Sequence, residues 1–425
     1  MTFVMLASMM VLFMLAVPVA ISIGLSSAIG IAFFTHFPMK LLAQQAFTAL
    51  DKFPLAAIPF FILAGNIMGT GGISSRLVAF AQSLVGGMRG GLASTCVLTC
   101  MFFAAVSGSS IATTFAIGSI LIPAMVKSGY PKPFAAALQA TSAELGVIIP
   151  PSIPMILYGV SANVSIGELF VSGIGPGILI AFALILGTYV WCRLRGYGDA
   201  GNEDRLGVVV AFRRSLLALM MPIIILGGIY GGIFTPTEAS IVAVFYALVV
   251  SMAIYRDIDW RSLLRILHQT AISSSIIMLI IAMAGIFSFM ITRAGVPAAI
   301  GTWLTGTFHS GWSFLLAVNA VLFIIGMFID AGASIIVLAP ILAPVANQFG
   351  IDPVHFGLVM VVNLALGMIT PPFGVNLFAA CAVAKVPLER VARPLCIYIL
   401  IIIACLMVIT YVPEVSLFFR DIIYR

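Results

Sequence analysis

The residues best suited to chemistry lie in two short polar interruptions of long apolar runs. The first interruption is Ser107-Gly108-Ser109-Ser110, and the second is Asp330-Ala331-Gly332-Ala333-Ser334. Hydroxyl and carboxylate oxygens are hard ligands, which suit a hard cation such as sodium. The alternative is that small residues at these positions only allow helices to pack closely.

A second pair of interruptions contains paired prolines. The segments Gly146 to Ser152 and Gly367 to Gly374 cannot continue a helix, because a proline lacks the N–H donor and its ring clashes with the preceding turn. Carbonyl groups of that turn are thereby freed. Such backbone is tolerated at membrane depth only where it is buried in protein or lines a cavity. The alternative is that the prolines merely kink a span.

We therefore predict two sodium sites, each between one polar interruption and one proline-containing loop. The predicted ligands are Ser107, Ser109, Ser110, Gly146 and Ile149 in the first site, and Asp330, Gly332, Ser334, Gly367 and Thr370 in the second. No other metal and no cofactor is expected, since the sequence has no His or Cys cluster with metal-ligand spacing.

Two more carboxylates lie within or next to apolar segments. Glu144 lies just ahead of the first proline pair and is a further candidate for function, because an ionisable group in an apolar run is costly. Glu238 instead indicates the start of a helix, with Thr235 or Thr237 as its cap.

The elements that hold these residues must be membrane helices. Of 425 residues, 62% are hydrophobic and only 8% are charged, whereas soluble domains contain about 25% charged residues. This composition excludes a soluble enzyme, a nucleic-acid-binding protein and a disordered scaffold. The net charge of +6 does not change this, because Lys and Arg lie mainly between apolar runs, where they orient the chain in the lipid bilayer.

The apolar runs give the expected segments. They span residues 3–34, 54–70, 91–126, 133–163, 169–192, 215–233, 238–254, 268–291, 312–346, 353–384 and 394–412. The first run contains Pro18 and is either one long tilted helix or two helices; it is expected to be retained rather than cleaved as a signal peptide. Runs 91–126 and 312–346 are too long for one span, and their polar interruptions favour re-entrant hairpins.

The sequence also repeats itself with an offset of 221 positions. Gly146 aligns with Gly367, and Pro150-Pro151 aligns with Pro371-Pro372. Basic residues flank the first hairpin but not the second, which indicates opposite orientations in the membrane. The Arg-rich segments 193–214 and 255–266 are assigned to the cytoplasmic face. The exceptions to this charge rule are Arg293, Arg420 and Arg425.

The predicted fold is therefore an all-α integral membrane protein with inverted repeats, two re-entrant hairpins and two broken transmembrane helices. This arrangement is that of secondary transporters, whose sites lie at the repeat interface.

At these residues the sequence resembles the large membrane subunit of tripartite ATP-independent periplasmic (TRAP) transporters, over essentially the whole chain. The segments that carry the resemblance are Ile58 to Gly65, Ser107 to Ser110 with Ala112-Thr113, Gly146 to Ser152, Thr235 to Ala239 and Gly367 to Gly374. By general similarity, the chain looks closest to the sialic-acid type.

The resemblance implies a sodium-coupled importer of an organic anion, here sialic acid, in the bacterial inner membrane. It implies a separate small membrane subunit and a periplasmic substrate-binding protein as partners, and no enzymatic activity. In the family, sodium binds between hairpin tips and broken-helix loops, which maps onto Ser107, Ser109, Ser110, Gly146, Asp330, Gly332, Gly367 and Thr370. Candidate substrate contacts are Thr113, Ser152 and Asn376.

The resemblance also implies an elevator motion and a division of the chain. Residues 89–168 and 311–389 would form the moving transport domain, and residues 1–88, 169–310 and 390–425 the scaffold with its arm helices and linker. The alternative function is a self-sufficient sodium/dicarboxylate-type symporter that needs no binding protein. An intramembrane hydrolase fits less well, because neither Ser109 nor Asp330 has a catalytic partner nearby in the sequence. A channel fits less well, because repeated broken helices indicate alternating access.

Overall fold

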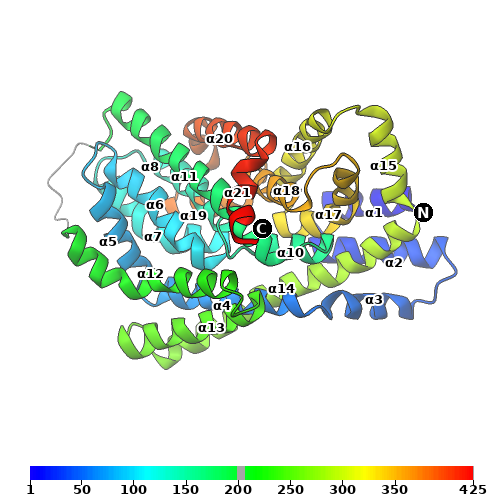
Figure 1. Ribbon diagram of the computed structural model, residues 1–425, viewed down its shortest axis with the longest axis horizontal. Helices are drawn as coiled ribbons and strands as arrows, with labels where there is room; N and C mark the ends of the chain where they lie inside the picture. Colours follow the sequence, from blue (N-terminus) through cyan, green and yellow to red (C-terminus); the bar gives the residue numbers. More distant parts are fainter. Residues whose placement is uncertain (199–205, 425) are drawn as a thin grey trace.

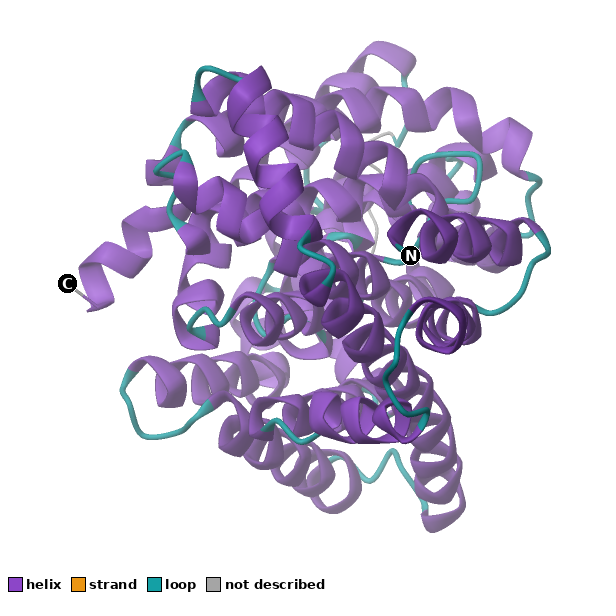
Figure 2. Cartoon of the chain, turned by 90° about the vertical axis from the view of Figure 1, so that its right-hand side faces the viewer, coloured by secondary structure: helices purple, strands orange, loops and turns teal. Residues whose placement is uncertain are grey.

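The computed structural model describes residues 1–198 and 206–424, and all regular secondary structure within them is helical (Figure 2). Arg205, of the Arg-rich segment, and Arg425 lie outside the described residues. Among the described helices, nine are long and apolar enough to cross a membrane, or ten if one bent pair counts as a single span.

Figure 1 shows the helices coloured in chain order, from blue at the N-terminus to red at the C-terminus. In the first half they are α1 (Thr2–Met14), α2 (Val19–Phe34), α3 (Lys40–Leu50), the 3-10 turn η1 (Phe53–Ala56), α4 (Ala57–Thr70), α5 (Ile73–Val85), α6 (Gly91–Ser107), α7 (Ser110–Lys127), α8 (Lys132–Ala143), α9 (Leu145–Ile148), α10 (Ile153–Ala162) and α11 (Ile166–Arg195). In the second half they are α12 (Val208–Tyr230), α13 (Pro236–Leu248), the π-helical η2 (Val249–Ile254), α14 (Trp260–Arg293), α15 (Val296–Thr307), α16 (Gly311–Phe328), α17 (Ala331–Gln348), α18 (Pro353–Met368), α19 (Val375–Ala384), α20 (Leu388–Tyr411) and α21 (Pro413–Tyr424).

The long apolar runs are broken where small polar residues or prolines interrupt them. The run 3–34 forms two helices, because α1 ends before Pro18 and α2 begins after it. The runs 91–126 and 312–346 are each divided into two helices, at Gly108-Ser109 and at Ile329-Asp330. The chain bends by 42° between α9 and α10, across the first proline pair. Local sequence therefore determines where these helices stop.

Helix boundaries recur between the two halves at the offset found in the sequence. Helix α7 covers residues 110–127 and α17 covers 331–348, 221 positions later. Packing partners are exchanged in the same way, since α7 lies against α19 and α17 lies against α10. The central part of the molecule is thus built from elements of both halves. The exception is α14, one helix of 34 residues where the first half has α3, η1 and α4.

Four helices lie outside the predicted apolar runs: α3, α5, α15 and α21. Each is short, and polar residues interrupt its apolar sequence, so that no continuous apolar run marks it. Helix α13 was predicted more closely. Thr235 caps it, and Glu238 completes a capping box by accepting the Thr235 N–H at 2.8 Å.

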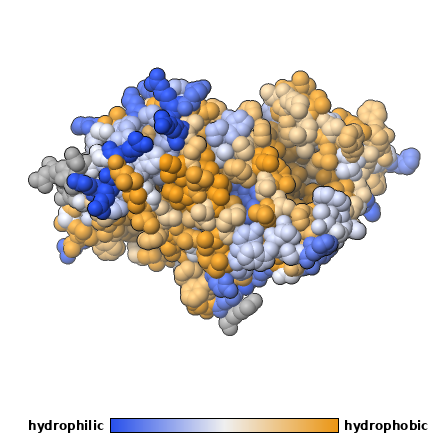
Figure 3. Space-filling view, turned by 90° about the horizontal axis from the view of Figure 1, so that it is seen from above, coloured by the Kyte–Doolittle hydropathy of each residue, from blue (hydrophilic) through white to orange (hydrophobic). Residues whose placement is uncertain are grey.

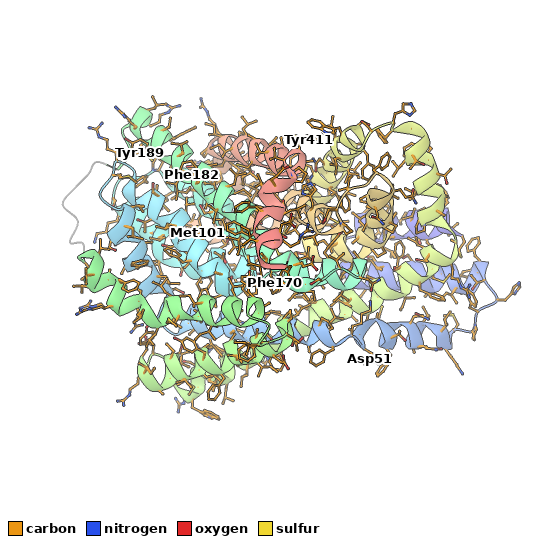
Figure 4. All side chains as sticks on the ribbon, viewed as in Figure 1. Asp51, Met101, Phe170, Phe182, Tyr189 and Tyr411 are labelled. Atoms are coloured by element: carbon orange, nitrogen blue, oxygen red, sulfur yellow. The ribbon has the colours of Figure 1, made fainter. Side chains whose placement is uncertain are left out.

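Segments predicted to share a membrane face lie together in the structure. At one end, the Gly90 N–H donates to the Gly198 carbonyl at 3.2 Å, which joins two segments assigned to the cytoplasm. Hydrophilic side chains gather at this end, on the left in Figure 3. Elsewhere, Tyr411 at the end of α20 (Figure 4) stacks on Trp312 with ring centroids 4.2 Å apart.

Candidate ion and substrate site

The first hairpin tip is a tight turn between α6 and α7. Gly108 has φ +62°, a left-handed conformation that glycine adopts without steric cost. Ser109 then begins α7, and its hydroxyl accepts the Ala112 N–H at 3.4 Å. The tip therefore follows directly from the Gly-Ser pair in the sequence.

The first proline-containing loop lies against this tip. The Ile153 N–H donates to the Gly108 carbonyl at 3.3 Å. Gly146 has no room for a side chain, because an added Cβ would lie 2.7 Å from the Ser109 carbonyl oxygen and from Thr113 Oγ1. The structure thus brings the first predicted hairpin tip and its predicted loop into contact.

The hydroxyl groups at this contact are mostly hydrogen-bonded within the protein. Thr113 donates to the Ser109 carbonyl at 2.8 Å and lies 2.9 Å from the Ser107 hydroxyl. Ser152 caps α10 and donates to the Val147 carbonyl at 2.6 Å. The Ser110 hydroxyl is buried, interacts with the Glu144 carboxylate and forms no short hydrogen bond among the described residues. At the first tip, Ser110 is therefore the hydroxyl least engaged by hydrogen bonds.

Ile149 contributes its backbone rather than its side chain. Its N–H donates to the Leu145 carbonyl at 2.8 Å, and its conformation is then extended. The apolar side chain faces Gly177 of α11, where an added Cβ would collide with it.

The second tip has a different structure. Ile329 is extended, and Asp330 caps α17: one carboxylate oxygen accepts the Gly332 N–H at 2.9 Å and the Ala333 N–H at 3.4 Å. Gly332 lies against Leu157 of α10, so this tip contacts the first half of the chain. The Ser334 hydroxyl is buried and has no partner among the described residues.

The second proline-containing loop packs on the helix that precedes its tip. Gly367 lies against Gly326 of α16 so closely that an added Cβ would fall on the Gly326 backbone. The Thr370 hydroxyl donates to the Leu366 carbonyl at 2.8 Å. The paired prolines of both loops are joined by cis peptide bonds.

The two predicted sodium sets therefore differ in how they are assembled. In the first set, Gly146 lies in contact with Ser109 of the hairpin tip. In the second set, Gly367 lies against Gly326 of α16, the helix before the tip, rather than against Asp330, Gly332 or Ser334.

A buried hydrogen-bond network connects three helices beside the first tip. Asn376 of α19 donates to Glu144 Oε1 at 2.7 Å and to the Ala140 carbonyl at 2.9 Å, and it accepts from the Thr114 hydroxyl at 2.6 Å. The Glu144 carboxylate also interacts with the Ser110 side chain, and its other oxygen forms no short hydrogen bond among the described residues. In this conformation both amide hydrogens of Asn376, predicted to contact substrate, are used inside the protein.

Sequence reasoning singled out Glu144 and Asn376 separately but did not pair them, and it missed Thr114. The pairing could not be read from spacing, because the two residues are 232 positions apart. A signal for Thr114 was available, since it lies one turn of α7 beyond Ser110 and belongs to the same helix face as that residue.

No basic side chain neutralises the central carboxylates. Within residues 1–198 and 206–424, ion pairs occur only between Arg76 and Asp257, and from Arg420 to Asp352 and Asp421. A buried carboxylate without a paired charge is unfavourable. Glu144 and the partly exposed Asp330 therefore have no paired positive charge among the described residues.

The sequence matches the family described as the tripartite ATP-independent periplasmic transporter, DctM component, over residues 6–415. The chain belongs to this family. This DctM component is accordingly a multi-pass protein of the bacterial inner membrane. Members of the family carry out secondary transport of organic acids with a small permease and a periplasmic binding protein, and they are permeases rather than enzymes.

Several relatives extend over nearly the whole DctM component. It is 42% identical to the C4-dicarboxylate TRAP transporter large permease protein DctM of Pseudomonas aeruginosa, over 93% of each chain. It is 36% identical to the ectoine TRAP transporter large permease protein TeaC of Halomonas elongata, over 100% of each chain. The isethionate TRAP transporter permease protein DctMQ of Oleidesulfovibrio alaskensis is 44% identical over 95% of this chain, which spans 64% of that relative's length.

A solved structure shares the fold of this DctM component. The YdaH transporter of Alcanivorax borkumensis superposes with a TM-score of 0.63 at 16% identity, over 87% of this chain and 86% of its own.

Proposed function

We propose that this DctM component imports an organic anion by coupling its movement to sodium, with a small membrane subunit and a periplasmic binding protein as partners. The observation that supports the proposal is the contact between the first hairpin tip and the residues around the first proline pair. The Ser109 carbonyl oxygen lies against Gly146 of the short helix α9, the Pro151 carbonyl oxygen lies against Gly108, and the neighbouring Ser110 hydroxyl is buried. Oxygen ligands of this kind suit a hard cation.

We further propose that the two halves are inverted repeats whose hairpins and broken helices move together as a transport domain, residues 89–168 and 311–389. The equal helix boundaries at an offset of 221 and the exchanged packing of α7 and α17 support this proposal. In such transporters the substrate binds where the repeats meet. Thr113, Ser152 and Asn376 lie in this region and remain the proposed substrate contacts.

The substrate class is an organic acid or a comparable small polar solute. The relatives' names specify C4-dicarboxylate, isethionate and ectoine, whereas the sialic-acid proposal rests on general similarity of sequence alone. All four compounds therefore belong in one substrate panel.

The test is uptake of each labelled compound into proteoliposomes that contain this chain and its small membrane subunit. Uptake is measured with and without the binding protein and with and without an inward sodium gradient. The proposal requires that one compound be accumulated only when both are present. Accumulation driven by sodium without any binding protein would favour the self-sufficient symporter, and accumulation without sodium would overturn the coupling.

A further inference from the structure

A basic pocket lies at the end of the molecule assigned to the cytoplasm, outside the proposed transport site. It has a volume of about 670 Å³ and is formed by the first turns of α5, the beginning of α12 and the segment after η2. In Figure 1 these elements meet at the left end of the molecule. The side chains that give it its charge are Arg76, Arg213, Arg214 and Asp257.

One of the three guanidinium groups is already neutralised and held in place. Arg76 Nη1 lies 2.8 Å from Asp257 Oδ2 and also donates to the Gly72 carbonyl at 2.8 Å. The same guanidinium stacks on the Tyr255 ring, 3.6 Å from its centroid. The pocket wall is therefore built by specific contacts rather than by loose surface side chains.

The other two guanidinium groups have no such partner. Arg213 and Arg214 follow one another on α12, both are exposed, and neither forms an ion pair with a carboxylate within the described residues. Backbone contacts fix their position: the Ser215 hydroxyl donates to the Arg76 carbonyl at 2.8 Å, and the Tyr255 hydroxyl donates to the Arg214 carbonyl at 3.4 Å. The pocket thus carries an excess of positive charge on a fixed frame.

The surroundings of the pocket are those of a membrane boundary. The side chains of Val209, Phe212 and Trp260 are 66%, 44% and 66% exposed, and each lies within a few residues of the basic cluster in sequence. Exposed apolar groups next to Arg are typical of the interface, where tryptophan is enriched. The lining itself combines guanidinium groups with the apolar side chains of Leu206 and Leu217.

The geometry points to a binding site for the phosphate headgroup of an anionic phospholipid between α5 and α12. A guanidinium group can donate two parallel hydrogen bonds to two oxygens of one phosphate. Basic pockets at the cytoplasmic ends of membrane helices bind phospholipid headgroups in this way. Arg213 and Arg214 bind the phosphate, and Arg76 with Tyr255 forms the wall behind it.

The test is native mass spectrometry of the detergent-solubilised full chain during titration with cardiolipin. The double variant Arg213→Gln/Arg214→Gln is compared with Arg193→Gln/Arg195→Gln, which removes the same charge from the same end of the molecule but outside the pocket. We expect the first variant to bind cardiolipin roughly tenfold to thirtyfold more weakly, since each basic residue near an anionic headgroup contributes about 1 kcal/mol. Equal binding by the two variants would overturn the site.

A lysine variant and a competition experiment with phosphate complete the test. Arg213→Lys/Arg214→Lys keeps the charge but loses the paired geometry, so it should bind with intermediate strength and serves as the test if the glutamine variant does not fold. Inorganic phosphate is then used as a competitor. Displacement of cardiolipin by low concentrations of phosphate would assign the pocket to a soluble phosphate compound and overturn the lipid assignment.

Discussion

The side-chain amide of Asn376 donates a hydrogen bond to the Glu144 carboxylate at 2.7 Å and so joins α19 to the junction of α8 and α9. This bond connects the second half of the chain to the broken helix of the first half. Both side chains are almost completely buried, at 0% and 1% exposure. A residue that follows the second proline-containing loop therefore helps to fix the position of the first proline-containing loop.

Replacing Asn376 by Ala should destabilise the protein. The variant leaves the buried Glu144 carboxylate, the Ala140 carbonyl and the Thr114 hydroxyl without a partner, which costs about 1–3 kcal/mol. We expect a lower midpoint of thermal unfolding in detergent. Ser142→Ala is the matched control, because its buried hydroxyl has no partner among the described residues. Equal midpoints for both variants would show that the network contributes nothing.

Adding a methyl group at Gly146 or Gly367 should impair transport. At Gly146 the new Cβ meets the Ser109 carbonyl oxygen at 2.7 Å, and at Gly367 it meets the backbone of Gly326. Overpacking of this kind costs about 1–3 kcal/mol, and neither backbone can move aside as a flexible side chain would. Sodium-dependent uptake should fall in both variants. Gly227→Ala, where no atom lies within 4 Å, should retain full uptake; loss there would indicate a general intolerance of substitution.

Asp330 allows its charge to be separated from its role as a helix cap. Asparagine caps helices as well as aspartate does, so Asp330→Asn should unfold near the wild-type temperature and yet raise the sodium concentration needed for half-maximal uptake. Asp330→Ala should in addition lose about 1 kcal/mol of stability. Ser109→Ala tests the other tip by the same uptake measurement. An unchanged sodium dependence in both Asp330→Asn and Ser109→Ala would remove these residues from the proposed ion sites.

The ion pair between Arg420 and Asp352 predicts a pH-dependent contribution to stability. Burial by itself raises the pKa of Asp352, but the hydrogen bond from Arg420 at 2.7 Å, its charge and the N–H groups of Val354 and His355 outweigh burial and hold this pKa below its usual range. The stabilisation is therefore present above the unfolded-state pKa of about 3.9 and is lost as pH falls through the lower pKa of the folded state.

At neutral pH, Arg420→Gln should lower stability by about 1.5–3 kcal/mol. Thermal unfolding of wild type and variant should be followed from pH 7 into the acid range. Their difference should shrink only once Asp352 is protonated. A constant difference over the whole range would mean that Arg420 acts through packing alone.

Local sequence predicted the breaks in the fold better than it predicted contacts. The helix ends near Gly108, Pro18 and the proline pairs follow from the few residues around them, so they could be read directly. The capping role of Asp330 is equally local, although its position in an apolar run favoured an ion ligand or a neighbour of the substrate site over a structural hydrogen bond. In contrast, the bond between Asn376 and Glu144 depends on how distant helices pack, and neither residue type specifies its partner.

Four short helices were not predicted from the apolar runs of the sequence. Helices α3, α5, α15 and α21 carry too many polar residues to form continuous apolar runs, so mean hydropathy does not mark them. Burial marks some of them weakly too, because α3 has no buried residue and α15 has only Gly301 and Leu304.

The interruption of α3 and α4 by η1 makes the two halves mechanically unequal. Helix α14 runs for 34 residues, about 50 Å, and can only flex as one stiff rod. Its counterpart has a joint at Phe53–Ala56, which is anchored on both sides: the Lys52 ammonium donates to the Val160 carbonyl of α10 at 3.3 Å, and the Thr237 hydroxyl of α13 donates to the Phe53 carbonyl at 3.4 Å. The angle between α3 and α4 is therefore set at a joint that α10 and α13 hold by hydrogen bonds, whereas the corresponding part of the second half is one continuous helix.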